Sequence, residues 1–261
     1  MKFLITLLAA CTLFTNCSKS NPTTDNTDNG TPPAGMVKGK IVNAQGQPVS
    51  GAKVYASHDT WFNTHVIGQT DANGNYQLNL KGQPAGTWSV YAQLAKNFNG
   101  KNYDFRIDPE NTASLTTTEG GIRNMIWKLT GVIPGSTDDT RMGGYVVFMG
   151  TSDDFVPVNE IEIKLVPQGT LVDGSNGTTI VRRAEIFPVP LFSLYANEGL
   201  RDIPVGRYAI SARRILANGS TQPMEITTVG GTVYTPVLTT DFFQEQPARY
   251  QQVALNIRVK I

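Results

Sequence analysis

The chain has 261 residues and a formal net charge of +1, from 22 basic and 21 acidic side chains. Nucleic acid is not expected as a partner, because phosphate backbones are held by strongly basic surfaces. Apolar residues make up 40% of the chain, and 25 Gly and 15 Pro residues provide for many turns. Runs of Ala, Glu, Lys and Leu at helical spacing are few, so this composition predicts an all-β fold.

Cysteine and histidine are scarce. Cys11 and Cys17 both lie near the N-terminus, so the rest of the chain can form neither a disulfide nor a catalytic thiol. The histidines are His58 and His65, which excludes a Ser-His-Asp triad from the C-terminal half.

Residues 1–16 resemble a bacterial lipoprotein signal peptide, with Lys2 ahead of an apolar stretch that is too short to span a bilayer. Cys17 is the predicted lipidation site. Cys11 is the alternative, since the residues before it match the usual lipobox better, but cleavage there leaves only about eight apolar residues. An ordinary cleaved signal without a lipid also stays open.

Residues 17–35 contain almost no large apolar side chains and are rich in Asn, Thr, Asp, Pro and Gly. Such a segment buries too little surface to offset the entropy of ordering, so a disordered tether is predicted. A lipid on Cys17 followed by this tether would hold a folded domain at a membrane. The expected location is therefore the cell envelope, as an outer-membrane lipoprotein. The sequence does not decide between the periplasmic face and the surface face of that membrane.

One sequence pattern occurs twice. Leu80–Ala92 reads LKGQPAGTWSVYA and Leu200–Ala212 reads LRDIPVGRYAISA, at a constant offset of 120 (200 − 80 and 212 − 92). In each copy a Pro-Gly turn precedes apolar residues on alternate positions, which is the period of a half-buried strand. The pattern predicts two copies of one β-module, with Trp88 and Tyr208 buried at equivalent positions.

The first module is predicted over residues 36–130. Apolar residues alternate with polar ones around Val37, Ile41 and Val54, and Thr70–Tyr76 (TDANGNY) forms a hairpin turn in which Gly supplies a positive φ. These turns and the Pro84-Ala-Gly-Thr-Trp motif resemble the carboxypeptidase regulatory-like domain. The resemblance implies a transthyretin-like β-sandwich, common in Bacteroidetes surface lipoproteins, and does not imply peptidase activity.

A linker is predicted over residues 131–144, and a second transthyretin-like or Ig-like β-sandwich over residues 145–261. Pro157-Val158 mirrors Pro48-Val49 at an offset of 109. The second copy therefore carries 11 more residues before Leu200 (120 − 109), which we place within residues 168–192. The closing segment from Val253 alternates cleanly and predicts an amphipathic strand.

The candidate contact residues lie in one long loop of the first module: His58, Asp59, Trp61, Phe62 and His65. The two histidines lack a third metal ligand, and a spacing of seven suits neither a helical nor a strand pair, so no metal or other cofactor is predicted. The loop is either merely solvated or an aromatic contact surface, since exposed aromatic rings suit sugar stacking or protein contact. The added length at residues 168–192 is the second candidate.

Other charged motifs are better explained by turns and strands. Asp71–Asn75 lacks the acidic residue of a calcium loop, because position 12 falls on Gly82. Asp138-Asp139 and Asp153-Asp154 are paired carboxylates of the kind that glycoside hydrolases use, although adjacent loop residues rarely face each other across a substrate. The arginine pairs Arg182-Arg183 and Arg213-Arg214 should point to opposite faces of their strands.

The leading functional hypothesis is a lipid-anchored binding or scaffolding protein, accessory to the capture and uptake of glycans or peptides. Its expected partners are the membrane, through the lipid, and a glycan or an outer-membrane protein. One alternative is a carboxylate-based hydrolase acting on envelope or dietary polysaccharide. The other is a purely structural spacer or an adhesin subunit.

Overall fold

The computed structural model describes residues 32–137, 140–151, 156–187, 198–244 and 251–259. The signal peptide with Cys11 and Cys17, most of the tether, and both acidic pairs (138–139 and 153–154) lie outside the described residues. Within the described ranges, no helix is long and apolar enough to cross a membrane.

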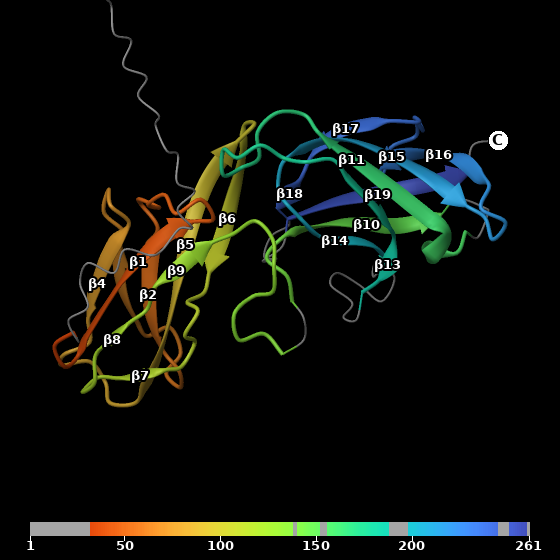
Figure 1. The fold of residues 1–261 in the computed structure, drawn as a ribbon. Coiled ribbons are helices and arrows are strands. Elements are labelled where there is room, and N and C mark those ends of the chain that lie inside the picture. The colour runs from red at the N-terminus through yellow and green to blue at the C-terminus, as the bar shows by residue number, and fades with distance from the viewer. Residues whose placement is uncertain (1–31, 138–139, 152–155, 188–197, 245–250, 260–261) are drawn as a thin grey trace, which may run out of the picture.

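Two β-modules lie side by side, the first coloured red to yellow-green and the second green to blue (Figure 1). Across the described residues, helical structure is limited to one 3-10 turn at Val158–Glu160. The predicted all-β fold is therefore confirmed. The strands of the first module are β1 (Met36–Asn43), β2 (Lys53–His58), β3 (His65–Gln69), β4 (Asn75–Asn79), β5 (Thr87–Phe98), β6 (Lys101–Ile107), β7 (Leu115–Thr116), β8 (Gly121–Ile122) and β9 (Met125–Trp127).

The first module is a sandwich of two separate sheets. One has the order β4-β1-β8, with β9 also paired to β1, and the other has the order β3-β2-β5-β6, with β7 beside β5. Strand β2 shows why they pack: Val54 and Ala56 are fully buried between the sheets, whereas Lys53 is exposed on the outer face. Period-two alternation thus divides each strand into a core face and a solvent face.

The second module contains a single continuous sheet, in the order β12-β11-β15-β16-β19-β10-β14-β13. Strand β16 causes the continuity, because it pairs with β15 through Thr221–Pro223 and with β19 from Met224 onward. The second module thus has the two layers of the predicted sandwich, and β16 is shared between them. The strands are β10 (Gly144–Thr151), β11 (Ile161–Pro167), β12 (Ile180–Arg183), β13 (Glu185–Ile186), β14 (Glu198–Ile203), β15 (Arg207–Ile215), β16 (Thr221–Thr228), β17 (Leu238–Asp241), β18 (Phe243–Gln244) and β19 (Gln251–Val259).

The sequence repeat is a structural repeat. Trp88 of β5 and Tyr208 of β15 are both fully buried, as predicted. Each donates a hydrogen bond to the carbonyl of the proline four residues earlier: Trp88 Nε1 to Pro84 O at 3.3 Å, and Tyr208 Oη to Pro204 O at 2.8 Å. In both copies, the turn and the strand are thus fastened by the same local contact.

Strand pairing follows the two predicted offsets. Trp88 pairs with His58 on β2, and Tyr208 pairs with Pro167 on β11, which is again 109 residues later (167 − 58). The next strand is shifted by 114, since Gly68 faces Val54 and Arg182 faces Ile163. Five of the 11 added residues (114 − 109) therefore lie in the β11–β12 loop, inside the predicted range, and the other six (120 − 114) lie between β12 and Leu200.

The two modules share an interface built on the β5–β6 hairpin. Tyr103 is buried and donates a hydrogen bond to the carbonyl of Phe242 at 2.6 Å. Asn99, at the Asn-Gly turn of this hairpin, donates to Asp241 Oδ1 at 2.8 Å, and Arg207 binds the other oxygen of Asp241 at 2.7 Å. The buried apolar residues of both modules consequently form one continuous cluster.

The predicted linker is fixed to the second module at both of its ends. Its two sides pair at Val132 and Arg141, and its base is held by Asp202, whose carboxylate accepts hydrogen bonds from the backbone of Gly131 at 2.8 Å and of Gly143 at 3.2 Å. Asp202 adopts φ +60°, a left-handed conformation that few residues other than Gly tolerate. The segment is therefore a hairpin-like loop fixed to the second module.

Candidate functional site

The five candidate contact residues lie in and beside the β2–β3 loop: Asp59, Trp61 and Phe62 are in the loop, His58 is the last residue of β2, and His65 is the first residue of β3. The loop begins where β2 ends at the buried His58 and finishes where the exposed edge strand β3 starts at His65. Asn63 adopts φ +56° and so allows the chain to turn back. The loop thus projects from one edge of the β3-β2-β5-β6 sheet.

His58 organises the loop from below. Its Nδ1 accepts hydrogen bonds from the backbone N–H groups of Thr60 and Trp61, both at 3.2 Å, and its Nε2 lies 3.1 Å from the carbonyl of Ala85. Because Nδ1 accepts these hydrogen bonds, Nε2 is the ring nitrogen placed to donate to the Ala85 carbonyl. Only 5% of the residue is exposed. His58 therefore supports the loop and offers no free nitrogen to a ligand.

Asp59 is held in its ionised form. Burial alone would raise the pKa of this carboxyl, but hydrogen bonds from Ser89, Thr87 and Ser114 outweigh burial, so that the pKa is lowered. The Ser89 hydroxyl donates to Asp59 Oδ1 at 2.6 Å. Asp59 remains exposed and presents a negative charge beside the loop.

Trp61 and Phe62 are the exposed aromatic residues of the loop. Trp61 is 55% exposed and Phe62 is 100% exposed. The indole of Trp61 stacks on the His58 ring at 5.3 Å and an interplanar angle of 29°. The His58 ring in turn meets the buried Trp88 edge-on at 5.0 Å. Trp61 is thus a positioned ring, with its inner face against His58 and much of its surface open to solvent.

The outer face of the sheet beside the loop carries a row of stacked side chains. Tyr55 and Tyr91 stack at 5.1 Å and 8°, Arg106 lies 4.1 Å over Tyr91, and His65 meets Tyr55 edge-on at 6.0 Å. These groups cover one another, so Trp61 and Phe62 are more exposed to solvent than Tyr55 and Tyr91. The alternation around Tyr55 already indicated an outward side chain, but the stack of Tyr55 on Tyr91 depends on pairing with a strand 36 residues away in sequence (91 − 55).

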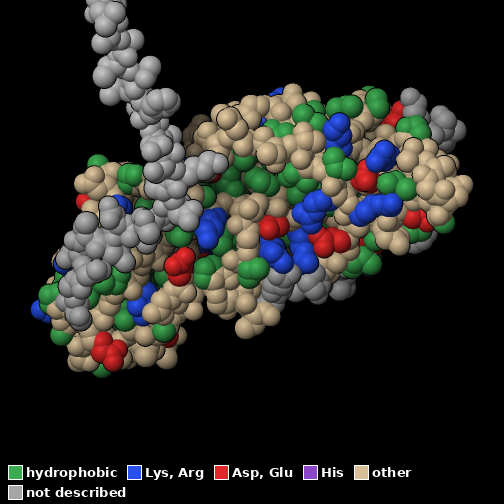
Figure 2. All heavy atoms as spheres, viewed as in Figure 1, with side chains coloured by type: hydrophobic (Ala, Val, Ile, Leu, Met, Phe, Trp, Pro, Cys, Tyr) green, Lys and Arg blue, Asp and Glu red, His purple; other side chains and the backbone are tan. Residues whose placement is uncertain are grey.

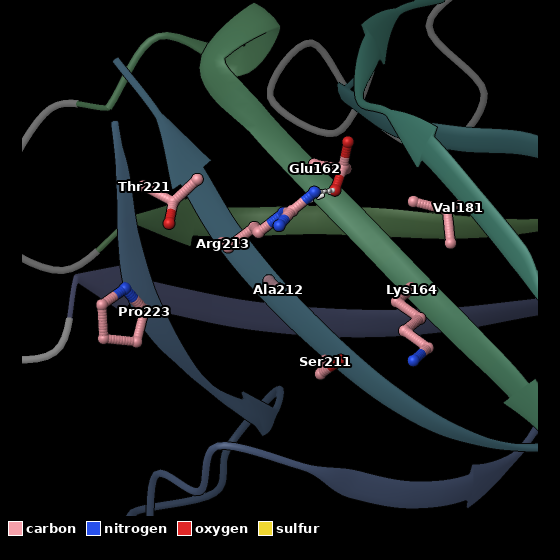
Figure 3. A pocket seen from close by; sticks show the side chains of 8 residues that line it. All are labelled: Glu162, Lys164, Val181, Ser211, Ala212, Arg213, Thr221 and Pro223. Atoms are coloured by element: carbon pink, nitrogen blue, oxygen red, sulfur yellow. Dashed lines mark hydrogen bonds and ion pairs between the residues drawn. The ribbon is translucent and has the colours of Figure 1, made fainter. Parts of the chain in front are cut away.

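The second module has a hollow on the outer face of its β12-β11-β15-β16 sheet, with a volume of about 490 Å³ (Figure 3). Strands β11, β12, β15 and β16 each contribute to it, and Val181 of β12 is the one lining residue that lies within the second predicted site, 168–192. Sequence analysis did not single out this hollow. It is lined by Glu162, Lys164, Val181, Ser211, Ala212, Arg213, Thr221 and Pro223.

Other predicted motifs have structural roles. Asp71 Oδ1 accepts hydrogen bonds from the backbone of Asn73 and Asn75, as expected of a hairpin turn. Arg213 and Arg214 point to different partners, Glu162 and Glu160. Among the residues that the structure describes, no group of three or more His, Cys, Asp or Glu side chains could hold a metal ion.

No family model and no curated protein matches the chain. The resemblance to the carboxypeptidase regulatory-like domain therefore stays a prediction. Among solved structures, the chain is similar to the Bacillus anthracis TIE protein (11% identity, TM-score 0.31), covering 87% of this chain and 34% of that one. The chain thus spans about a third of the length of that solved structure.

Two pilus proteins show comparable similarity. For BcpA, the major pilin subunit of Bacillus cereus, the identity is 10%, the TM-score is 0.25, and the match covers 87% of this chain and 99% of that one. For the pilus adhesin SpaC of Lactobacillus rhamnosus GG, the identity is 8%, the TM-score is 0.26, and the match covers 87% of this chain and 31% of that one. At such identities and TM-scores, these similarities assign neither a family nor an activity to this chain.

Proposed function

We propose that this protein is a lipid-anchored binding protein of the cell envelope, of the adhesin type, that contacts its partner through the β2–β3 loop. The observation that carries the proposal is the exposure of Trp61 and Phe62 at the end of an ordered loop. Rings with two rotatable side-chain bonds offer a large contact area for a small loss of conformational entropy.

The contacts beneath the loop support this proposal. Trp61 rests on His58, and His58 is fixed by three hydrogen bonds and by the edge of Trp88. Binding through a ring that is already positioned costs less ordering entropy than binding through a mobile one. The ionised Asp59 adds an acceptor for hydroxyl or amide donors. A sugar ring or a protein surface would both find flat apolar area beside a polar rim here.

Attachment to the envelope is part of the proposal. A signal peptide over residues 1–16, lipid on Cys17 and a tether over residues 17–35 would hold the two modules at a membrane surface. In this arrangement the loop meets partners at or near the cell surface.

A structural spacer is the second candidate. The continuous buried core, with Tyr103 bonded to Phe242 and Asn99 to Asp241, ties the modules together and would suit a stiff connecting segment. The hydrolase alternative stays a prediction, because the aspartates that motivated it lie outside the described residues.

The test is a Trp61→Ala, Phe62→Ala double variant of the mature chain. Retention by a polysaccharide panel in affinity electrophoresis, and by isolated envelope proteins, should be lost, while the free energy of unfolding stays within about 0.5 kcal/mol of the parent. Val233→Ala with Val237→Ala is the matched control, since these residues are 73% and 53% exposed on the second module. Unchanged retention in the loop variant would exclude this loop as the contact surface and favour the spacer.

A further inference from the structure

The hollow of the second module occupies the face that aromatic side chains cover in the first. The strand offsets place Lys164 where β2 has Tyr55 (55 + 109) and Ser211 where β5 has Tyr91 (91 + 120). Val181 takes the place of Ile67 on the edge strand (67 + 114). A stacked tyrosine pair is thus replaced by a lysine and a serine, and the missing ring volume opens the hollow.

The fold itself does not require this exchange. The two modules bury equivalent strands, and the outer face of β2 shows that large rings are compatible with the same pairing. A hollow that the repeated architecture can fill, but leaves open in one copy, is a candidate binding site.

Several polar groups in the hollow are available to a ligand. Within the described part of the chain, Lys164 has no ion-pair partner, and the hydroxyls of Ser211 and Thr221 make no side-chain hydrogen bond. Arg213 binds Glu162 through Oε1 only, at 2.6 Å from Nε, which leaves Oε2 as a free acceptor (Figure 3). The hollow therefore offers donors, one acceptor and one uncompensated ammonium group.

The charge of this face favours an anion. Four cations lie on the outer face of β11, β12 and β15, namely Lys164, Arg183, Arg207 and Arg213. Arg207 is paired with Asp241, and Glu162 is the carboxylate beside the other three. Arg183 bonds to the carbonyl of Asn159, which leaves its charge uncompensated. In the space-filling view, Lys and Arg side chains lie interspersed with Asp and Glu side chains over this module (Figure 2).

The polar groups beside Lys164 indicate that the ligand carries hydroxyl groups as well as a negative charge. Lys164 is directly opposite Ser211, and Glu162 is directly opposite Arg213, so cation, hydroxyl and acceptor share two adjacent cross-strand rows, with Cβ atoms about 5 Å apart within each row. The apolar lining is limited to Val181, Ala212 and Pro223. No aromatic or long aliphatic side chain is present to hold a peptide side chain.

We propose that this hollow binds an acidic sugar, a pyranose that carries a carboxylate. The carboxylate lies at Lys164, the ring hydroxyls reach Ser211, Thr221 and the free oxygen of Glu162, and the C–H face of the ring rests on Val181, which is directly opposite Lys164. This site is separate from the β2–β3 loop and does not depend on the function proposed for that loop.

The test is calorimetric titration of the mature chain with a galacturonic acid trimer and with the neutral galactose trimer. The acidic trimer should bind at least tenfold more tightly, and its affinity should fall as salt is raised, because salt screens the exposed charges. Lys164→Met removes the charge, keeps most of the stem, and should reduce affinity at least tenfold. Ser211→Tyr restores the ring of the first module and should abolish binding.

Lys53→Met is the matched control, because Lys53 lies on the outer face of the first module, on β2. The affinity of this variant for the acidic trimer should change less than twofold. Trp61→Ala with Phe62→Ala should likewise leave the acidic trimer bound, which separates this site from the loop. Equal binding of the neutral trimer, no binding of either trimer, unchanged affinity in Lys164→Met, or binding of a glutamate peptide in place of the sugar would each overturn the proposal.

Discussion

His58 is held by its neighbours through both ring nitrogens. His58→Ala removes the hydrogen bonds to Thr60, Trp61 and Ala85 and the edge contact with Trp88. We expect the free energy of unfolding to fall by about 2–3 kcal/mol, because a buried polar network and ring packing are lost together. Urea denaturation measures the change.

His65→Ala is the control for this prediction. His65 is exposed at the start of β3, so its removal should cost less than about 0.5 kcal/mol. Equal effects of the two substitutions would show that His58 does not support the loop.

Asp202 combines a left-handed backbone with a carboxylate that closes the inter-module loop. Asp202→Ala should lower the free energy of unfolding by about 2–4 kcal/mol. The variant loses these hydrogen bonds, and alanine lacks the short polar side chain that helps Asp to adopt φ +60°. Asp202→Asn keeps an acceptor and tolerates the left-handed region, so it should cost about half as much. Thermal unfolding of the two variants gives the comparison, and an alanine variant as stable as the asparagine variant would contradict it.

At the scale of elements, the Pro-turn and the strand after it form the repeated unit. Trp88→Ala and Tyr208→Ala should each cost about 3–5 kcal/mol, because both rings are fully buried. Tyr208→Phe keeps the ring and loses the bond to Pro204, so a cost of about 1 kcal/mol is expected. Denaturant titration of the three variants checks this order. A mild effect of either alanine substitution would mean that the two strands are not equivalent core elements.

Strand β16 makes the two modules differ. Its first residues extend the sheet of β15 and its later residues extend the sheet of β19, so one strand belongs to both layers. The first module has no strand that joins its two sheets. Pairing along the whole of β16 should therefore couple the layers of the second module more tightly than side-chain packing alone couples those of the first.

At the scale of the whole molecule, the shared core makes one cooperative unfolding transition the expectation, in place of separate melting of two independent modules. Tyr103→Ala removes the buried ring between them and its bond to Phe242. Scanning calorimetry should then show a broadened or split transition. Two resolved transitions in the parent protein would contradict the coupling.

Tyr103 also makes the interface sensitive to alkaline pH. Burial, with a smaller contribution from the charge of Asp241, raises the pKa of Tyr103 to about 12, against about 10 in the unfolded chain. The folded state thus disfavours the phenolate, so this contribution is fully present below pH 10 and is lost as pH rises through 12. The loss amounts to about 2–3 kcal/mol.

Tyr103→Phe has no phenol to ionise, so its free energy of unfolding should fall less steeply than that of the parent between pH 10 and pH 12. Burial also raises the pKa of Tyr208 to about 12. Both proteins therefore lose some stability, and the difference between them is the quantity to measure. Parallel pH profiles would show that Tyr103 is not buried at the interface.

Local patterns in the sequence determined the all-β class, the repeat and its offsets, because side-chain alternation and Pro-Gly turns depend on residues close along the chain. They also placed Trp61 and Phe62 in an exposed loop. The burial of His58 was decided only in three dimensions, since its partners at Ala85 and Trp88 lie about 30 residues away. The hollow of the second module likewise required tertiary structure: four strands define it, and its volume depends on which side chains are small where separate segments meet.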